Sequence, residues 1–371
     1  MGDLIDTAWQ WCLERFRAGE HWLIDDKRAR YGASVARIIY GLVIVLFVLA
    51  NFARRDYLWG SASGWVKPIE PSTQWAVPFT FYSSSDPEWL FTLKFLLLGV
   101  AGLALLLGWH SRISAIVVLY LYISLVTTNP VATDQTDNAL RIILFYFLFT
   151  DMSAHWSLDA RRRRIQDAKG GRRRLMQWWF SNILHNGAII AVAMQIFIIY
   201  VVAGLSKVKG SQWQDGTAVY YPLHLDSLSP WPALSHLLVS NSLAVNFVTY
   251  FAVFIQLFFP FLLLARWTRV IALLGIVGMH VGIGILMGLP LFSMAMMAAD
   301  GIFIRDATYA RIEHYVKRTT VPWLKRKLAR GRPDTPPRPG ESTRAEAPGG
   351  AGDALGEREQ ESVGAGTTPS T

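Results

Sequence analysis

Long apolar segments limit what this chain can fold into. Windows of about 18 or more mainly apolar residues recur along the sequence, and a helix of that length can cross a lipid bilayer. The composition agrees, because 52% of the 371 residues are hydrophobic and only 17% are charged. The sequence therefore predicts an all-α fold, a polytopic bundle of about eight transmembrane helices in a lipid bilayer. The predicted spans are 34–54, 89–107, 112–128, 138–151, 184–206, 245–265, 269–289 and 290–305.

The composition divides the chain into three parts. Residues 1–27 alternate apolar and charged positions at helical spacing, which predicts an amphipathic helix in the membrane interface; an ordinary helix packed on the membrane domain is the alternative. Residues 28–315 form the predicted transmembrane domain. Residues 316–371 begin basic and, from about Arg332, become rich in Pro, Gly, Ala, Glu and Ser. Such a composition cannot bury enough apolar surface to fold, so a disordered tail is predicted.

The placement of basic residues predicts an orientation. The net charge is +9, and eight Lys and Arg lie in the segment 159–183. The segments 55–88, 128–137 and 207–243 are poorer in Arg, and 55–88 is predicted to be an external cap. By the positive-inside rule, 159–183 and both termini are cytoplasmic. Because the basic residues lie between apolar spans, they argue for a membrane topology signal and against binding to nucleic acid.

Metal and nucleotide sites are not predicted. Cys12 is the single cysteine, which excludes an internal disulfide and a cysteine-based metal site. The histidines are scattered without a metal-ligand spacing, and no glycine-rich phosphate loop occurs.

A polar cluster is predicted where the fifth span ends, in the sequence YVVAGLSKVKGSQWQDGTAVYY. Tyr200, Gly204 and Lys207 fall near one helical face. Gly204 would let another backbone or a flat ligand come close. A cation at the end of a membrane helix is a functional candidate, and burial would favour a neutral amine that acts as a base. A lysine that only snorkels to the interface is the alternative. We also expect Tyr200 to hydrogen-bond Lys207.

Two further polar residues stand out within the spans. His280 has small neighbours, which leave room for a ligand or for a helix–helix hydrogen bond. Arg141 is expected to pair with Asp134 or Asp137 at the outer end of the fourth span, and the alternative to a functional role is a structural ion pair. The sequence also places other polar residues in the spans, namely Gln195, Gln256 and Asp300.

The order of several motifs resembles the horizontally transferred transmembrane (HTTM) family, which shares its membrane domain with vitamin K-dependent gamma-carboxylase. The resemblance covers roughly residues 30–305. It rests on Gly108-Trp-His-Ser-Arg112, Asn129-Pro130, Asp137-Asn-Ala-Leu-Arg141, Trp156-Ser-Leu-Asp159, Ala203-Gly-Leu-Ser-Lys207 with Trp213 and Gly216, and His280.

The resemblance implies a carboxylase-like lyase that oxidises a quinol. In the carboxylase, a lysine acts as a base on a reduced quinone, oxygen then yields a strong base, and a glutamate side chain captures carbon dioxide. Carried over, Lys207 would be the base and His280 a stabilising partner. The implied residues around the cofactor are Tyr200, Gly204, Trp213, Gly216 and Arg141.

Two features differ from the carboxylase. A functional histidine of the carboxylase is replaced here by the sequence Gln135-Thr-Asp-Asn138, and nothing after about residue 330 is predicted to form its β-rich domain.

Some bacterial relatives serve in the maturation of secreted peptides. Two hypotheses therefore stay open for a protein of a bacterial inner (plasma) membrane. One is a quinol-dependent enzyme acting at the outer face, and the other is a non-catalytic partner in the maturation or export of a secreted peptide or protein. A transporter ranks third, because the halves show no clear inverted repeat.

Overall fold

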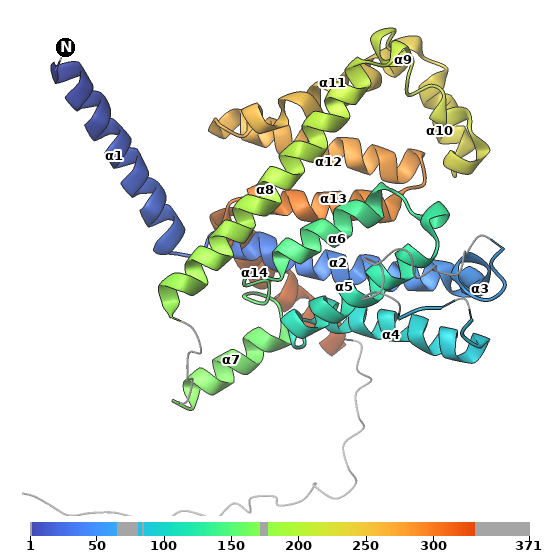
Figure 1. Cartoon of the computed structure of the whole chain (residues 1–371), viewed down its shortest axis with the longest axis horizontal. Coiled ribbons are helices and arrows are strands. Elements are labelled where there is room, and N and C mark those ends of the chain that lie inside the picture. Colours follow the sequence, from blue (N-terminus) through green and yellow to red (C-terminus); the bar gives the residue numbers. More distant parts are fainter. Residues whose placement is uncertain (1, 65–80, 84, 171–176, 331–371) are drawn as a thin grey trace, which may run out of the picture. The chain divides into compact units, whose positions relative to one another are not determined.

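The computed structural model describes residues 2–64, 81–83, 85–170 and 177–330. Throughout these residues the regular structure is helical and includes no strand, which confirms the predicted all-α fold (Figure 1). The described residues belong to two units, one that ends at Tyr315 and one that begins at Val316. The α-helices are α1 (Gly2–Ile24), α2 (Arg30–Asn51), α3 (Arg55–Trp59), α4 (Glu88–Leu107), α5 (Ser111–Thr128), α6 (Gln135–Phe147), α7 (Leu158–Ala168), α8 (Trp178–Val208), α9 (Ser211–Gln214), α10 (Pro232–Val239), α11 (Ser242–Leu262), α12 (Arg266–Leu286), α13 (Pro290–Asp300) and α14 (Asp306–Arg330).

Some predictions fall on parts of the chain that are not described. The predicted disordered tail lies outside the described residues from 331 onward, as do residues 65–80 of the predicted external cap. Residues 2–24 do form one helix, and the Asn186 side chain of α8 donates hydrogen bonds to the carbonyls of Leu23 and Asp26 near the end of α1. The placement of α1 in a membrane interface stays a prediction.

The described residues contain six helical segments that are long and apolar enough to cross a membrane, so the chain is an integral membrane protein. The remaining two predicted spans correspond to shorter helices. Helix α6 has 13 residues, and α13 has 11 residues before a 3-10 turn, Gly301–Phe303. The six long segments are Arg30–Trp59, Glu88–Leu107, Ser111–Thr128, Trp178–Val208, Ser242–Leu262 and Arg266–Leu286.

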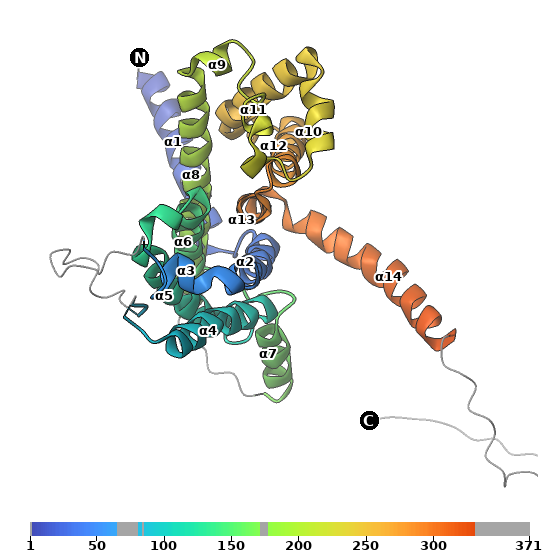
Figure 2. The ribbon, with the colours of Figure 1, turned by 90° about the vertical axis from the view of Figure 1, so that its right-hand side faces the viewer.

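Helix α2 lies between α4 and α13 in both views (Figures 1 and 2). Two glycines allow α2 and α4 to approach closely. A Cβ atom added to Gly41 would lie 2.7 Å from Leu106 Cα and 2.9 Å from Gly102 O. Small residues at such crossings let helix backbones pack in contact, which is how helices associate in a bilayer. On the other side of α2, the buried Tyr40 hydroxyl donates to the Ala295 carbonyl of α13 at 3.1 Å.

Arg37 fastens the C-terminal end of α4 to α2. Its side chain is 1% exposed, and its Nη1 atom donates to the carbonyls of Leu105 and Leu106 at 2.7 and 2.6 Å. The Nε and Nη2 atoms donate to the carbonyls of Met152 and Trp156. The last carbonyls of a helix have no partner within the helix, so a buried arginine that satisfies them stabilises this end.

Two of the sequence motifs contact one another at this same end. The Asp159 carboxylate accepts hydrogen bonds from the backbone N–H groups of His110 and Ser111, at 3.0 and 2.8 Å, and from the Ser111 hydroxyl at 2.8 Å. The Asp159 N–H donates to Gly108 O at 3.0 Å. Asp159 thereby caps the N-terminus of α5 from a distant part of the sequence.

The second half of the membrane domain positions the candidate site. Helix α8 packs against α11, and α12 and α13 form a pair that contacts α2 and α8. A Cβ atom added to Gly204 would lie 3.2 Å from the backbone N of Leu257 in α11. Gly204 thus lets the backbones of α8 and α11 approach closely. Of the two predicted alternatives, a neighbouring backbone or a flat ligand, the structure shows the backbone. The space beside it is filled by α11 rather than left for a flat ligand.

Candidate functional site

Lys207 lies in the last turn of α8, half-buried between α11 and α9. Its Nζ atom donates a hydrogen bond of 2.8 Å to the side-chain oxygen of Gln256, which is 7% exposed. The same Nζ atom lies 5.1 Å from the centre of the Trp213 ring. Among the residues that the structure describes, no carboxylate lies within ion-pair distance of Lys207. The amine is therefore held by a neutral amide and an aromatic ring.

The short helix α9, which follows α8, places Trp213 beside the lysine. Gly216 has φ of 72°, a left-handed conformation that favours glycine, and an added Cβ atom would collide with the Asn246 side chain of α11. The Tyr250 hydroxyl, also on α11, donates to the Gln214 carbonyl at 2.7 Å. Gly216 therefore shapes the turn that follows α9, and its role next to a cofactor stays a prediction.

A second polar cluster joins three helices deeper in the bundle. The Tyr200 hydroxyl of α8 donates to Asp300 Oδ2 of α13 at 2.7 Å and lies 3.1 Å from His280 Nε2 of α12. All three side chains are 1% exposed. Tyr200 precedes Lys207 by seven residues, which corresponds to about 10 Å along the axis of a helix.

The expected hydrogen bond between Tyr200 and Lys207 is wrong. Tyr200 faces α12 and α13, whereas Lys207 faces Gln256 of α11. Two turns of helix separate the two side chains, and each finds a nearer partner on a neighbouring helix. Of the two predicted alternatives for His280, the structure shows the helix–helix hydrogen bond, and it adds Asp300 as a third member.

The cluster contains buried atoms that lack a hydrogen-bond partner. Within the described residues, four buried side-chain atoms have none, and three of them lie on α12 and α13: His280 Nδ1, Ser293 Oγ and Asp300 Oδ1. An unsatisfied buried polar group costs about 1–3 kcal/mol, so such atoms normally bind water or a ligand. The His280 Nδ1 and Asp300 Oδ1 atoms suit a small polar group that both donates and accepts hydrogen bonds, such as water or a hydroxyl.

Arg141 lies apart from these residues. It lines a groove of about 550 Å³ between α5 and α6 that no other predicted site residue lines. Its guanidinium donates to the Asn138 side chain rather than pairing with Asp134 or Asp137, which corrects the expected ion pair. Those two carboxylates form a capping box at the start of α6, and Asp137 also accepts from the Tyr122 hydroxyl. The role of Arg141 next to the cofactor stays a prediction.

Several residues of the site were not assigned a role from the sequence. Gln256 and Asp300 were noted as polar residues within apolar spans, but the partner of neither was identified. Ser293 gave no signal, because a serine in an apolar helix is common. The one usable signal is a carboxylate or amide in the middle of an apolar segment, where it must face a partner or a cavity.

Comparisons with known proteins place the chain in a family. The HTTM domain matches residues 29–307. The chain is also 25% identical over 217 residues to the sporulation-delaying protein SdpB of Bacillus subtilis (strain 168). That alignment covers 57% of this chain and 63% of SdpB, so the chain spans less than two thirds of the relative's length. No solved structure matches the chain significantly.

Proposed function

The chain belongs to the HTTM-domain family, as its motif order predicted, and from that premise we propose that it is a membrane enzyme in which Lys207 acts as a base on a reduced quinone. The observation that carries the proposal is the setting of the lysine amine. Lys207 contacts an amide oxygen and an aromatic face, with no carboxylate of the described residues beside it to hold it as an ammonium. A lysine in a low-dielectric site of this kind is suited to accept a proton.

The chemistry divides between the bound group and the chain. A reduced quinone supplies an acidic hydroxyl and, with dissolved oxygen as acceptor, gives up two electrons and two protons to form quinone and hydrogen peroxide. Lys207 Nζ takes the hydroxyl proton. The Gln256 oxygen accepts a hydrogen bond from the amine in either protonation state. The Trp213 ring stabilises the ammonium through its negative face.

His280, Asp300 and Tyr200 have a positioning role in this proposal. Tyr200 and Lys207 belong to the same helix, so the buried cluster lies about two turns deeper than the base. The partnerless His280 Nδ1 and Asp300 Oδ1 atoms would bind ordered water or an oxygen of the bound group, which supports a polar ligand in an otherwise apolar interior.

The proposed orientation places Lys207 at the outer face of a bacterial inner membrane. Helix α7 carries Arg161, Arg162, Arg163 and Arg164 and precedes the start of α8, whereas Lys207 lies at the end of α8. The 31 residues of α8 span about 45 Å, which exceeds the thickness of a hydrocarbon core. If the arginine run is cytoplasmic, Lys207 is on the opposite side.

Native mass spectrometry of the purified full chain tests the proposal. We expect a quinone to co-purify with the wild-type protein and with the Lys209→Ala variant, which removes an exposed lysine from the same helix end. The Lys207→Ala variant is expected to retain about tenfold less, the effect of losing one hydrogen bond. Equal quinone in all three proteins, or no quinone in the wild type, contradicts the proposal.

A second function is favoured by the similarity to SdpB, whose name describes a sporulation-delaying protein. In this alternative the chain is a non-catalytic membrane partner in the maturation or export of a secreted peptide, and the segment between α8 and α11 contacts the peptide. Crosslinking of that segment to a peptide, with no effect of Lys207→Ala, would favour this alternative over the enzyme.

A further inference from the structure

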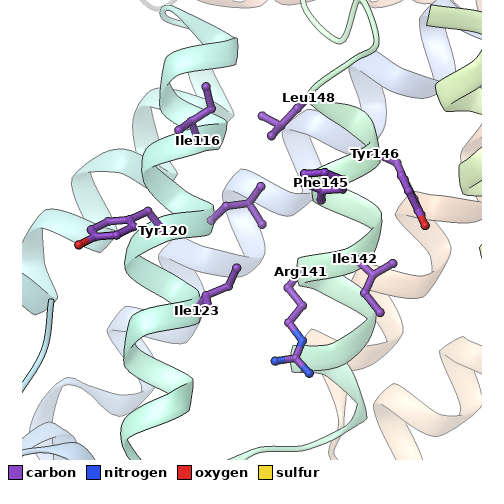
Figure 3. A pocket seen from close by; sticks show the side chains of 9 residues that line it. Ile116, Tyr120, Ile123, Arg141, Ile142, Phe145, Tyr146 and Leu148 are labelled. Carbon is purple, nitrogen blue, oxygen red and sulfur yellow. The ribbon is translucent and has the colours of Figure 1, made fainter. Parts of the chain in front are cut away.

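The groove between α5 and α6 is lined mainly by apolar side chains and by Arg141, and it has no part in the proposed function. It has a volume of about 550 Å³, and its walls are aliphatic and aromatic side chains apart from Arg141 and the hydroxyls of Tyr120 and Tyr146 (Figure 3). Ile116 and Phe145 at this groove are 55% and 49% exposed. Because α5 is long and apolar enough to span a membrane, side chains exposed on it face lipid. The groove therefore opens toward the bilayer.

Arg141 brings a positive charge to one end of the groove. Its guanidinium has five N–H donors, and the described contact with Asn138 uses the NH2 group. No carboxylate of the described residues lies within ion-pair distance of the guanidinium, and the nearest ones in the sequence, Asp134 and Asp137, accept from the Thr136 N–H and the Asp134 N–H. The guanidinium can therefore make further charge-assisted hydrogen bonds to an anion that enters the groove.

The apolar walls continue away from this charge. Figure 3 shows Ile123 on α5 near the level of Arg141, then Phe145 on α6, and finally Ile116 with Leu148 at the far end. Arg141 and Leu148 are seven residues apart, which corresponds to about 10 Å along a helix. A positive group at one end of an apolar channel matches an amphiphile that has an anionic head and a hydrocarbon tail.

We propose that this groove binds one acyl chain of an anionic phospholipid, with the lipid phosphate at Arg141. The commitment to a phospholipid follows from charge complementarity, because an arginine fork pairs with phosphate oxygens, whereas a neutral quinone offers it no charge. It also follows from position, because the bilayer supplies phospholipid directly to a groove that opens toward it. The site is separate from Lys207, so it stands whether or not the proposed enzyme activity is correct.

Competition between two lipids tests the site. The purified full chain is mixed with phosphatidylglycerol and phosphatidylcholine that carry identical acyl chains, and bound lipid is counted by native mass spectrometry. We expect the wild type to retain the anionic lipid preferentially. Arg141→Gln should lower that preference about fivefold, the effect of one arginine near a membrane surface. Arg266→Gln, which removes an exposed arginine from the start of α12, serves as the charge-matched control and should keep the preference.

A second pair of variants tests whether the groove binds the acyl chain of the lipid. Ile123→Trp fills the groove and should reduce retention of both lipids, whereas Ile113→Trp adds the same bulk to a residue of α5 that is 61% exposed and does not line the groove. If Arg141→Gln fails to fold, Arg141→Lys keeps the charge and should keep the anionic preference.

Three outcomes would overturn the proposal. The first is an unchanged preference in Arg141→Gln, and the second is an equal loss in Arg266→Gln, which would reflect total charge alone. The third is retention of a quinone that disappears in Arg141→Gln, which would assign the groove to the cofactor instead of a phospholipid.

Discussion

The Lys207 amine donates to the Gln256 side-chain oxygen at 2.8 Å, so the cation at the end of α8 is paired with an amide. An amide oxygen accepts a hydrogen bond from an amine in both of its protonation states, whereas a carboxylate would favour the ammonium. A structural lysine in a membrane protein gains most from a carboxylate partner. The choice of glutamine therefore favours a lysine that exchanges protons.

A carboxylate in place of the Gln256 amide should lower the quinol oxidation that depends on Lys207. In Gln256→Glu the new side chain pairs with Lys207 and holds it as an ammonium, so we expect quinol oxidation at pH 7 to fall at least about tenfold. The rate of quinone formation measures the effect. Gln212→Glu adds the same charge at an exposed residue of α9 and should leave the rate unchanged. A Gln256→Glu protein as fast as wild type would show that pairing of the lysine is irrelevant.

The buried Tyr200 hydroxyl should matter for stability. Tyr200→Phe leaves Asp300 Oδ2 and His280 Nε2 without their shared partner in a site that is 1% exposed, so the free energy of unfolding should fall by about 1–3 kcal/mol. Thermal unfolding in detergent reports the change. Tyr221→Phe, at a residue that is 49% exposed, should change the free energy by less than about 0.5 kcal/mol. Equal midpoints for both variants would contradict the buried cluster.

The crossing of α2 and α4 should not tolerate a methyl group. Gly41→Ala places a Cβ atom against the Leu106 backbone, so we expect a loss of about 1–3 kcal/mol in the free energy of unfolding. Gly187→Ala provides the matched control, because nothing lies within 4 Å of its added Cβ atom. In α8 that change should be neutral or stabilise by up to about 1 kcal/mol. The reverse order of unfolding temperatures would refute the close crossing.

Asp159 should make stability depend on pH. Burial alone would raise the pKa of this carboxyl, but hydrogen bonds from the Ser111 backbone and hydroxyl and from the His110 backbone outweigh it and hold the pKa below its usual value. A lowered pKa means that the stabilisation is complete above the unfolded value of about 3.9 and is lost as pH falls through the folded value.

The corresponding variant removes the cap of α5. Asp159→Ala should cost about 1 kcal/mol at pH 7, and the difference from wild type should shrink below about pH 4. Unfolding at a series of pH values measures it, with Asp167→Ala as the control at an exposed residue of α7. A difference that stays constant down to pH 3 would show that the Asp159 charge contributes nothing.

The sequence predicted the class of fold because long apolar runs have few solutions in a bilayer. It was less informative about α6 and α13, whose 13 and 11 residues are shorter than the six long segments. A short apolar helix gives the same hydropathy signal whether it spans the membrane or packs within the bundle. The predicted count of eight rests on these two helices.

The predicted grouping of residues matches the structure where they are close in sequence and is incomplete where they are distant, and the roles assigned to them stay predictions. Lys207, Trp213 and Gly216 lie within ten residues of each other, so spacing alone indicated one locality. The pairing of Tyr200 with Asp300 joins residues 100 positions apart, and no helical periodicity reveals it. Arg37 was missed as a structural residue for the same reason, since its carbonyl partners come from α4 and from the segment before α7.

The rate of quinol oxidation measures whether Lys207 acts as a base. The full chain in lipid nanodiscs is given a reduced short-chain naphthoquinone and dissolved oxygen, and quinone formation is followed by its absorbance. We expect catalysis by the wild type and by Lys209→Ala, and a rate at least about a hundredfold lower for Lys207→Ala, the usual contribution of a general base. A Lys207→Ala rate within about twofold of the wild type would contradict the assignment of Lys207 as the base.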